Sequence, residues 1–264
     1  MQRPVLLPSK SEGESFAGYS YHLDGSLVPA LTVDLTGNTG IYFEHHTLLW
    51  KSTSVNIGIK SLSGAFKRMF SGMPIFMTEA LGSGPIAFSR DGAGQIFAMH
   101  LRRGQELDVR EHQFLAATNT VSYNFQMVNG ISNMLFGGMG FFIDKFTAQA
   151  DDGIVWLQGY GNVFEVNLGP GEQIDVEPSA WLYKDPSVQM DTVLTNLSTS
   201  FFGGSSFTLN RFTGPGRLGI QSMSLLPMMD ASASANAQIG NTNAAGTAGA
   251  LGLAAAAFSL FNKE

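Results

Sequence analysis

A short Phe-Gly-Gly stretch recurs along the chain at a fixed interval. Phe136-Gly137-Gly138 is followed 66 residues later by Phe202-Gly203-Gly204, and an altered copy, Phe70-Ser71-Gly72, stands 66 residues before it. A period of this size redefines the unit that has to fold. We therefore predict three tandem copies of one module of about 66 residues.

A module of this size is too small to fold well alone. About 66 residues bury only about 60% of their unfolded surface, so we expect the three copies to share a core as one fused domain over residues 28–223. The predicted modules cover residues of about 30–95, 96–162 and 163–223, with an N-terminal arm over 1–27 and an Ala/Gly-rich tail over 224–264.

Alternating apolar residues predict strands at matching places in each copy. The first strand of each copy, over residues 31–35, 97–101 and 164–168, is apolar at every second position, which is the period of a half-buried strand. The second strand, over 41–44, 107–110 and 174–177, has a charged residue at its fourth position. We expect one face of this strand to pack and the other to meet water. Tyr19, Tyr21 and Leu23 alternate in the same way and predict a strand in the arm.

The composition agrees with this strand pattern. Thirty-one Gly, twenty Phe and only 14% charged residues are typical of a turn-rich protein with an aromatic core. Aromatic residues that recur between copies, such as Phe142 and Phe146, are expected in that core. The predicted fold is all-β, with three tandem β-sandwich-like modules in a pseudo-threefold arrangement. One short helix is predicted over residues 62–70.

The tail differs from the rest of the chain. Residues 231–250 are almost entirely Ala, Ser, Asn, Gly, Thr and Gln, a composition typical of a flexible linker. Residues 244–261 carry no charge and end in Phe258 and Phe261. We predict a flexible or helical tail whose end docks on the protein, on a partner or on a membrane surface. A membrane span is the weaker alternative, because Ala and Gly supply little transfer energy.

Charge and cysteine content exclude several classes of function. The net charge of −6 and the sequence pI near 5.3 disfavour nucleic-acid binding. RNA binding through Lys60, Lys67 and Arg68 is kept as a hypothesis beside the scaffold and small-ligand hypotheses given below. The absence of cysteine excludes disulfides and thiolate chemistry and suits a reducing compartment. The first residues lack the apolar core of a signal peptide. We expect a cytoplasmic protein, with peripheral membrane association through the tail as an extension of that expectation.

Four motifs resemble a known family. They are Pro170-Gly171-Glu172-Gln173-Ile174-Asp175-Val176, Phe114-Leu115-Ala116-Ala117, Phe136-Gly137-Gly138-Met139-Gly140-Phe141-Phe142 and Phe212-Thr213-Gly214-Pro215-Gly216-Arg217. Over about residues 28–223 the chain resembles the altered-inheritance-of-mitochondria family of bacterial and fungal mitochondrial proteins. The resemblance implies a β fold like that of the tryptophan RNA-binding attenuator protein, with an internal pseudo-threefold. It also implies a link to inner-membrane organisation in mitochondrial members, and it supplies no catalytic residue.

Histidines form the only local cluster with ligand chemistry. In the alignment of the copies His46 falls over His112, but the third equivalent residue is Ser179. Neighbouring His45 and His46 would point to opposite faces of a strand. A small-ligand or metal site that uses His46 and His112 at the module interface is therefore an alternative, and surface histidines at a strand end are the favoured interpretation.

We predict a non-enzymatic scaffold or interaction protein with no cofactor. No nucleophile elbow and no phosphate-binding loop is present. The expected partners are unidentified proteins, with a membrane surface and further copies of the chain as additional partners. The candidate interaction residues are Phe201, Phe202, Lys67, Arg68, Phe258 and Phe261; exposed together, Phe201 and Phe202 would form an apolar patch suited to a protein.

Overall fold

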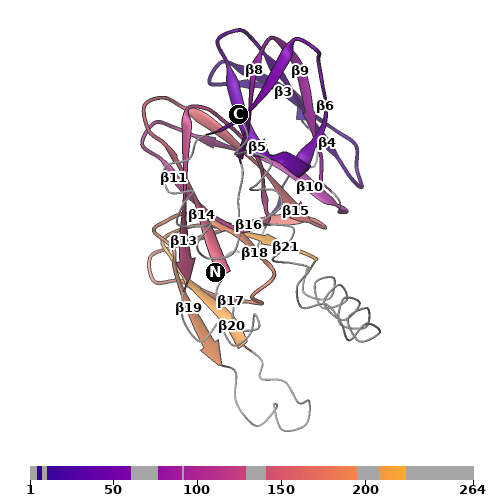
Figure 1. The fold of residues 1–264 in the computed structure, drawn as a ribbon. Coiled ribbons are helices and arrows are strands. Elements are labelled where there is room, and N and C mark those ends of the chain that lie inside the picture. The colour runs from indigo at the N-terminus through magenta and orange to yellow at the C-terminus, as the bar shows by residue number, and fades with distance from the viewer. Residues whose placement is uncertain are drawn as a thin grey trace, which may run out of the picture. The chain divides into compact units, whose positions relative to one another are not determined.

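The computed structural model describes residues 5–7, 11–60, 77–90, 92–128, 141–194 and 208–223. The chain divides into two compact units, Met1–Ser224 and Leu225–Glu264, and every described residue belongs to the first. The described residues form strands β1 to β21 and one short 3-10 helix, η1 (His45–Thr47), so the predicted all-β fold is confirmed (Figure 1). The predicted helix over 62–70, the three Phe-Gly-Gly stretches and the tail lie outside the described residues.

Three strands form the N-terminal arm. They are β1 (Val5–Leu6), β2 (Ser11–Phe16) and β3 (Tyr19–Asp24). Tyr19, Tyr21 and Leu23 are all buried, which confirms the strand predicted from their alternation. β3 pairs with β2 on one side and β4 on the other, whereas β1 pairs with β16.

The remaining strands fall into three consecutive segments of six. The first segment contains β4 (Ala30–Leu35), β5 (Gly40–Glu44), β6 (Leu48–Lys51), β7 (Val55–Ile59), β8 (Met77–Gly82) and β9 (Gly84–Phe88). The middle segment contains β10 (Gly94–Leu101), β11 (Glu106–Arg110), β12 (Phe114–Thr118), β13 (Val121–Val128), β14 (Phe141–Ala148) and β15 (Gly153–Tyr160). The last segment contains β16 (Val163–Leu168), β17 (Gln173–Val176), β18 (Trp181–Lys184), β19 (Gln189–Leu194), β20 (Thr208–Thr213) and β21 (Gly216–Gln221).

Strands pair in the same order within each segment. The first and third strands of a segment pair with its sixth, and the second and fourth pair with its fifth, always antiparallel. The third strand has a register shift at the same place in all three segments, between Leu48 and Trp50, Phe114 and Ala116, and Trp181 and Tyr183. Each segment therefore supplies two three-stranded groups. The pseudo-threefold relation between the segments stays a prediction.

The turns between the first and second strands are of two kinds. Gly104 and Gly171 have φ angles of +82° and +74°, a backbone conformation that residues with a side chain disfavour. The turn at Gly37-Asn38 uses Thr39 instead. Its amide donates to the Thr36 carbonyl at 2.9 Å, and its hydroxyl accepts from the Thr36 amide at 2.7 Å.

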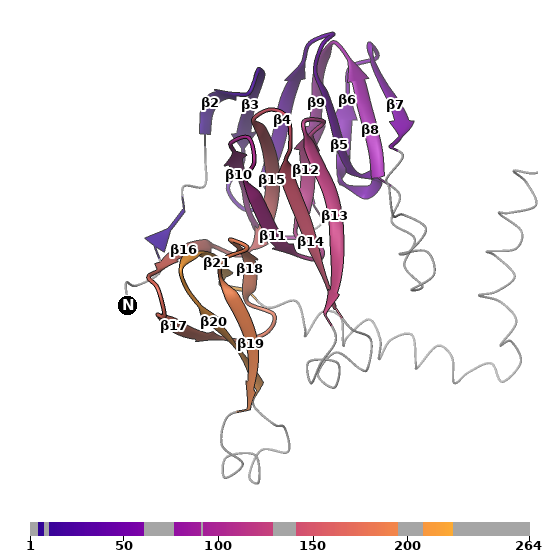
Figure 2. The same ribbon diagram turned by 90° about the vertical axis from the view of Figure 1, so that its left-hand side faces the viewer.

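The three-stranded groups combine into four sheets (Figure 2). One sheet has the order β10-β15-β12-β5-β8-β7 and joins the first and middle segments. A second has the order β1-β16-β21-β18-β11-β14-β13 and joins the middle and last segments. The other two are β2-β3-β4-β9-β6 and β17-β20-β19. β6 and β17 thus stand at sheet edges.

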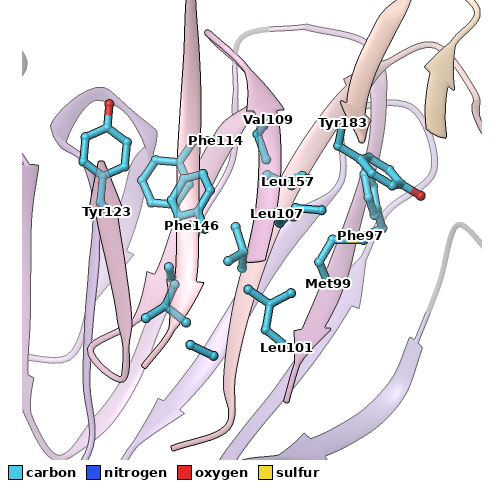
Figure 3. Close-up of a cluster of buried hydrophobic side chains, with 14 of the residues drawn as sticks. Phe97, Met99, Leu101, Leu107, Val109, Phe114, Tyr123, Phe146, Leu157 and Tyr183 are labelled. Carbon is cyan, nitrogen blue, oxygen red and sulfur yellow. The ribbon is translucent and has the colours of Figure 1, made fainter. Parts of the chain in front are cut away.

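The buried apolar side chains form three clusters. A middle cluster contains Phe114 and Phe146, whose ring centroids lie 4.9 Å apart (Figure 3). A first cluster is built mainly from the arm and first segment, and a smaller last cluster gathers around Trp181 and Phe212. Phe142 and Phe146 are buried, which confirms the prediction that these aromatics belong to the core.

Candidate functional site

Two joins connect successive segments inside the chain. At the first join β5 pairs with β12, and at the second join β11 pairs with β18. Both joins thus place the second strand of one segment against the third strand of the next. Every residue of β5, β12 and β18 is buried. The joins are therefore continuous sheet with a closed interior rather than surface contacts between separate domains.

An ion pair is buried at the second join. Asp108 of β11 lies opposite Lys184 of β18, with Lys184 Nζ 2.8 Å from Asp108 Oδ2. Lys145, on β14 of the same segment as Asp108, lies 3.1 Å from Asp108 Oδ1. The Asp108 and Lys184 side chains are 6% and 8% exposed. One carboxylate therefore links a lysine of its own segment to a lysine of the next, and removal of one partner would leave a buried charge uncompensated.

A guanidinium group links the first join. Buried Arg90 donates to Glu44 Oε2 at 2.7 Å and to the Phe114 carbonyl at 3.0 Å. It also donates to the His112 carbonyl, and its Nη2 lies 3.1 Å from His46 Nε2. At the second join Arg110 donates to the Ser179 carbonyl at 2.9 Å. Both joins therefore satisfy a corner carbonyl with a buried arginine.

The two predicted histidines meet at this first join, but not as a pair of ligands. His46 uses its ring and His112 its backbone carbonyl toward Arg90. Both side chains are exposed, as the favoured surface interpretation predicted. The permanent charge of Arg90 disfavours a metal cation beside it. Within the described part of the chain, no group of three His, Cys, Asp or Glu side chains could hold a metal ion.

One prediction about the second strands is wrong. Their charged fourth position was expected to face water, but Glu44 and Arg110 are buried. Both residues lie at joins, where the next segment covers the face that the sequence pattern assigned to solvent. Glu177 of the last segment is exposed, as predicted. Among the described strands, none pairs with β17 on the side where β12 pairs with β5 and β18 pairs with β11.

Two edges lack the second neighbour that their counterparts have. Among the described strands, β6 pairs only with β9, and β17 pairs only with β20. In β6, Leu49 is 57% exposed and Trp50 is 47% exposed, whereas Leu115 and Leu182 at the matching positions of β12 and β18 are fully buried. Figures 1 and 2 both show β6 and β17 at separate places. A sheet edge of this kind can pair with another strand, and the β6 edge also carries exposed apolar side chains.

A cavity of about 330 Å³ lies beside the arm. The Tyr21 hydroxyl donates to Glu14 and lies 2.8 Å from His100 Nε2, while Phe16 stacks on the His100 ring with centroids 4.4 Å apart. Burial lowers the pKa of His100, so its ring is biased toward the neutral form. The cavity can offer hydrogen bonds to a small polar molecule. His100 was not among the predicted site residues, although it occupies the polar side of the alternating stretch 97–101.

The predicted interaction residues Phe201, Phe202, Lys67, Arg68, Phe258 and Phe261 lie outside the described residues. Lys60 of the RNA hypothesis is described, and it lies 3.1 Å from Asn119 Oδ1, 3.5 Å from Glu79 Oε1 and over the Tyr42 ring. Sequence reasoning also overlooked Leu49 and Trp50. The repeats could have indicated them. If the third strand of each later segment is buried by the segment before it, the third strand of the first segment has no such neighbour.

The fold and the edges define an all-β protein built from joined antiparallel sheets. The family described as mitochondrial biogenesis AIM24 matches residues 21–223. The chain belongs to this family, and the family resemblance drawn from the motifs is confirmed.

A solved structure supports the fold. The X-ray crystal structure of a Streptococcus pyogenes protein from a structural genomics programme is similar, with a TM-score of 0.64 and 20% identity over 81% of this chain and 97% of that chain. No curated protein matches the sequence significantly. Among the residues that the structure describes, no helix has the length and apolar character needed to cross a membrane.

Proposed function

We propose that the protein is a scaffold that binds other protein chains through the exposed edge of β6, rather than an enzyme. The observation that carries this proposal is the exposure of Leu49 and Trp50 on a strand whose counterparts are wholly buried. Exposed apolar residues on an open edge are what strand addition by a partner requires. The family description, mitochondrial biogenesis, supports a role in assembly.

We also propose that the protein acts in the cytoplasm and associates peripherally with a membrane through its tail. The uncharged stretch ending in Phe258 and Phe261 supports this part of the proposal. Flotation of the full chain with lipid vesicles tests it, because Phe258→Ser with Phe261→Ser should abolish flotation. Equal flotation of the variant and the parent chain would contradict the role of the tail.

Site-specific photo-crosslinking in cells tests the scaffold proposal. A photoreactive phenylalanine analogue replaces Leu49 in one variant and Leu27, which is 71% exposed, in a matched control. We expect protein adducts at position 49, whether with other proteins or with further copies of this chain, and few at position 27. Equal yields of protein adducts at the two positions would contradict the proposal.

A further inference from the structure

We propose that the β6 edge of one molecule pairs with the β17 edge of a second molecule, head to tail, as a third join of the kind that already occurs twice inside the chain. This inference rests on the proposed binding function of β6 and names its partner. Each internal join pairs the second strand of one segment with the third strand of the next. Among the described strands, β17 is a second strand with no third strand beside it, and β6 is a third strand with no second strand beside it.

The internal joins also give the register of the new one. Ala116 lies opposite Phe43 at the first join, and Tyr183 lies opposite Val109 at the second. The shared register shift aligns Trp50 with Ala116 and Tyr183. The pairing of each second strand with its fifth strand aligns Val176 with Phe43 and Val109. Trp50 of one molecule would therefore lie opposite Val176 of the other.

Charge complementarity follows from this register. At the second join, the pair next to Tyr183 and Val109 is Lys184 and Asp108. At the proposed join, the pair next to Trp50 and Val176 would be Lys51 and Asp175. The two aspartates also have matching partners on the fifth strand of their own segments. Asp175 already binds Arg211 of β20 at 2.7 and 2.8 Å. In the same way, Asp108 binds Lys145 of β14.

The central leucine of each third strand supplies the apolar part of the contact. Leu115 belongs to the first cluster and Leu182 to the middle cluster, so each packs into the core of the segment before its own. By the same rule Leu49 would pack into the last cluster of a neighbouring molecule. That cluster is the smallest of the three and keeps Ile174 and Met190 only partly buried. A second copy would cover both apolar surfaces at once.

Because the two surfaces differ, a single contact is heterologous and leaves one β6 edge and one β17 edge open, so further molecules can add to form rings or filaments. Each molecule would use both edges. This assembly needs no separate partner, and it covers the β6 and β17 edges that an isolated chain leaves open.

Charge reversal in the full chain tests the proposal by sedimentation and light scattering. We expect the parent protein to associate, and Lys51→Asp or Asp175→Lys alone to weaken association about 100-fold, because each places like charges at a closed contact. Lys51→Asp with Asp175→Lys restores the pair and should restore association. Asp34→Lys, which changes another exposed aspartate on a strand, should associate like the parent.

Far-ultraviolet circular dichroism verifies that each variant is folded. Leu49→Asp offers a second route, since Leu49 is exposed in the single chain and its change should abolish association without unfolding the protein. A parent protein that stays monomeric, or single reversals that associate as well as the parent, would overturn the proposal. A monomer that still gives adducts with other proteins at position 49 would overturn self-association and leave the scaffold function intact.

Discussion

The β18 and β6 strands show how one sequence pattern can produce a core strand or an exposed edge. Trp181-Leu182-Tyr183 and Leu48-Leu49-Trp50 occupy the same place in their segments and pair in the same way with a sixth strand. Leu182 is fully buried, whereas Leu49 is 57% exposed. The difference lies in the neighbour, because β18 has β11 beside it and β6 has no described strand there. Burial at this position is therefore decided by the join and not by the segment itself.

Truncation of the two leucines should give the largest contrast. Leu182→Ala removes a fully buried side chain, and we expect a loss of about 4 kcal/mol in the free energy of unfolding. Leu49→Ala should change it by less than about 0.5 kcal/mol in dilute protein, because that side chain is mostly exposed. Urea denaturation measures both. Similar losses for the two variants would contradict the conclusion that the neighbouring strand decides burial at this position.

Neutralising Asp108 or Asp175, which occupy matching positions, should give a smaller difference in the free energy of unfolding. Asp108→Asn removes the partner of Lys184 and Lys145 inside a join, and we expect a loss of about 3 kcal/mol. Asp175→Asn removes only the more exposed pair with Arg211, at a cost of about 1 kcal/mol or less in dilute protein. The same denaturation measurement applies. A larger loss for Asp175→Asn would show that the edge is already a closed contact.

The pH dependence of stability should show the smallest effect. It reports on His100 beside the cavity and not on the joins. Burial lowers the pKa of His100, Glu14 opposes this by a smaller amount, and Arg102 lowers the pKa further. The unfolded chain then takes up a proton first as the pH falls through about 6.5, so stability should decrease from pH 7 to pH 5. His100→Gln should flatten this decrease, because it removes the titrating ring. Parallel curves for the parent and His100→Gln would contradict the account of the cavity.

Local strand positions could be predicted from the sequence because they depend on alternation within a few residues. The stretches 31–35, 97–101 and 164–168 all lie in the strands expected of them. The joins could not be predicted in this way. Glu44 and Arg110 look like solvent-facing residues of a half-buried strand, and only the neighbouring segment buries them. The contact of Arg90 with His46 also joins residues far apart in the chain, so no local spacing predicts it.

Disulfide trapping directly tests whether β6 of one molecule pairs with β17 of another, because the chain has no cysteine of its own. Lys51→Cys and Asp175→Cys are introduced together, and the protein is oxidised in dilute solution. A matched control pairs Lys51→Cys with Asp191→Cys, on the far strand β19 of the same sheet as β17. We expect a ladder of covalently linked chains for positions 51 and 175 and none for the control. Only unlinked chains for both proteins, or equal ladders, would contradict a β6–β17 join between molecules.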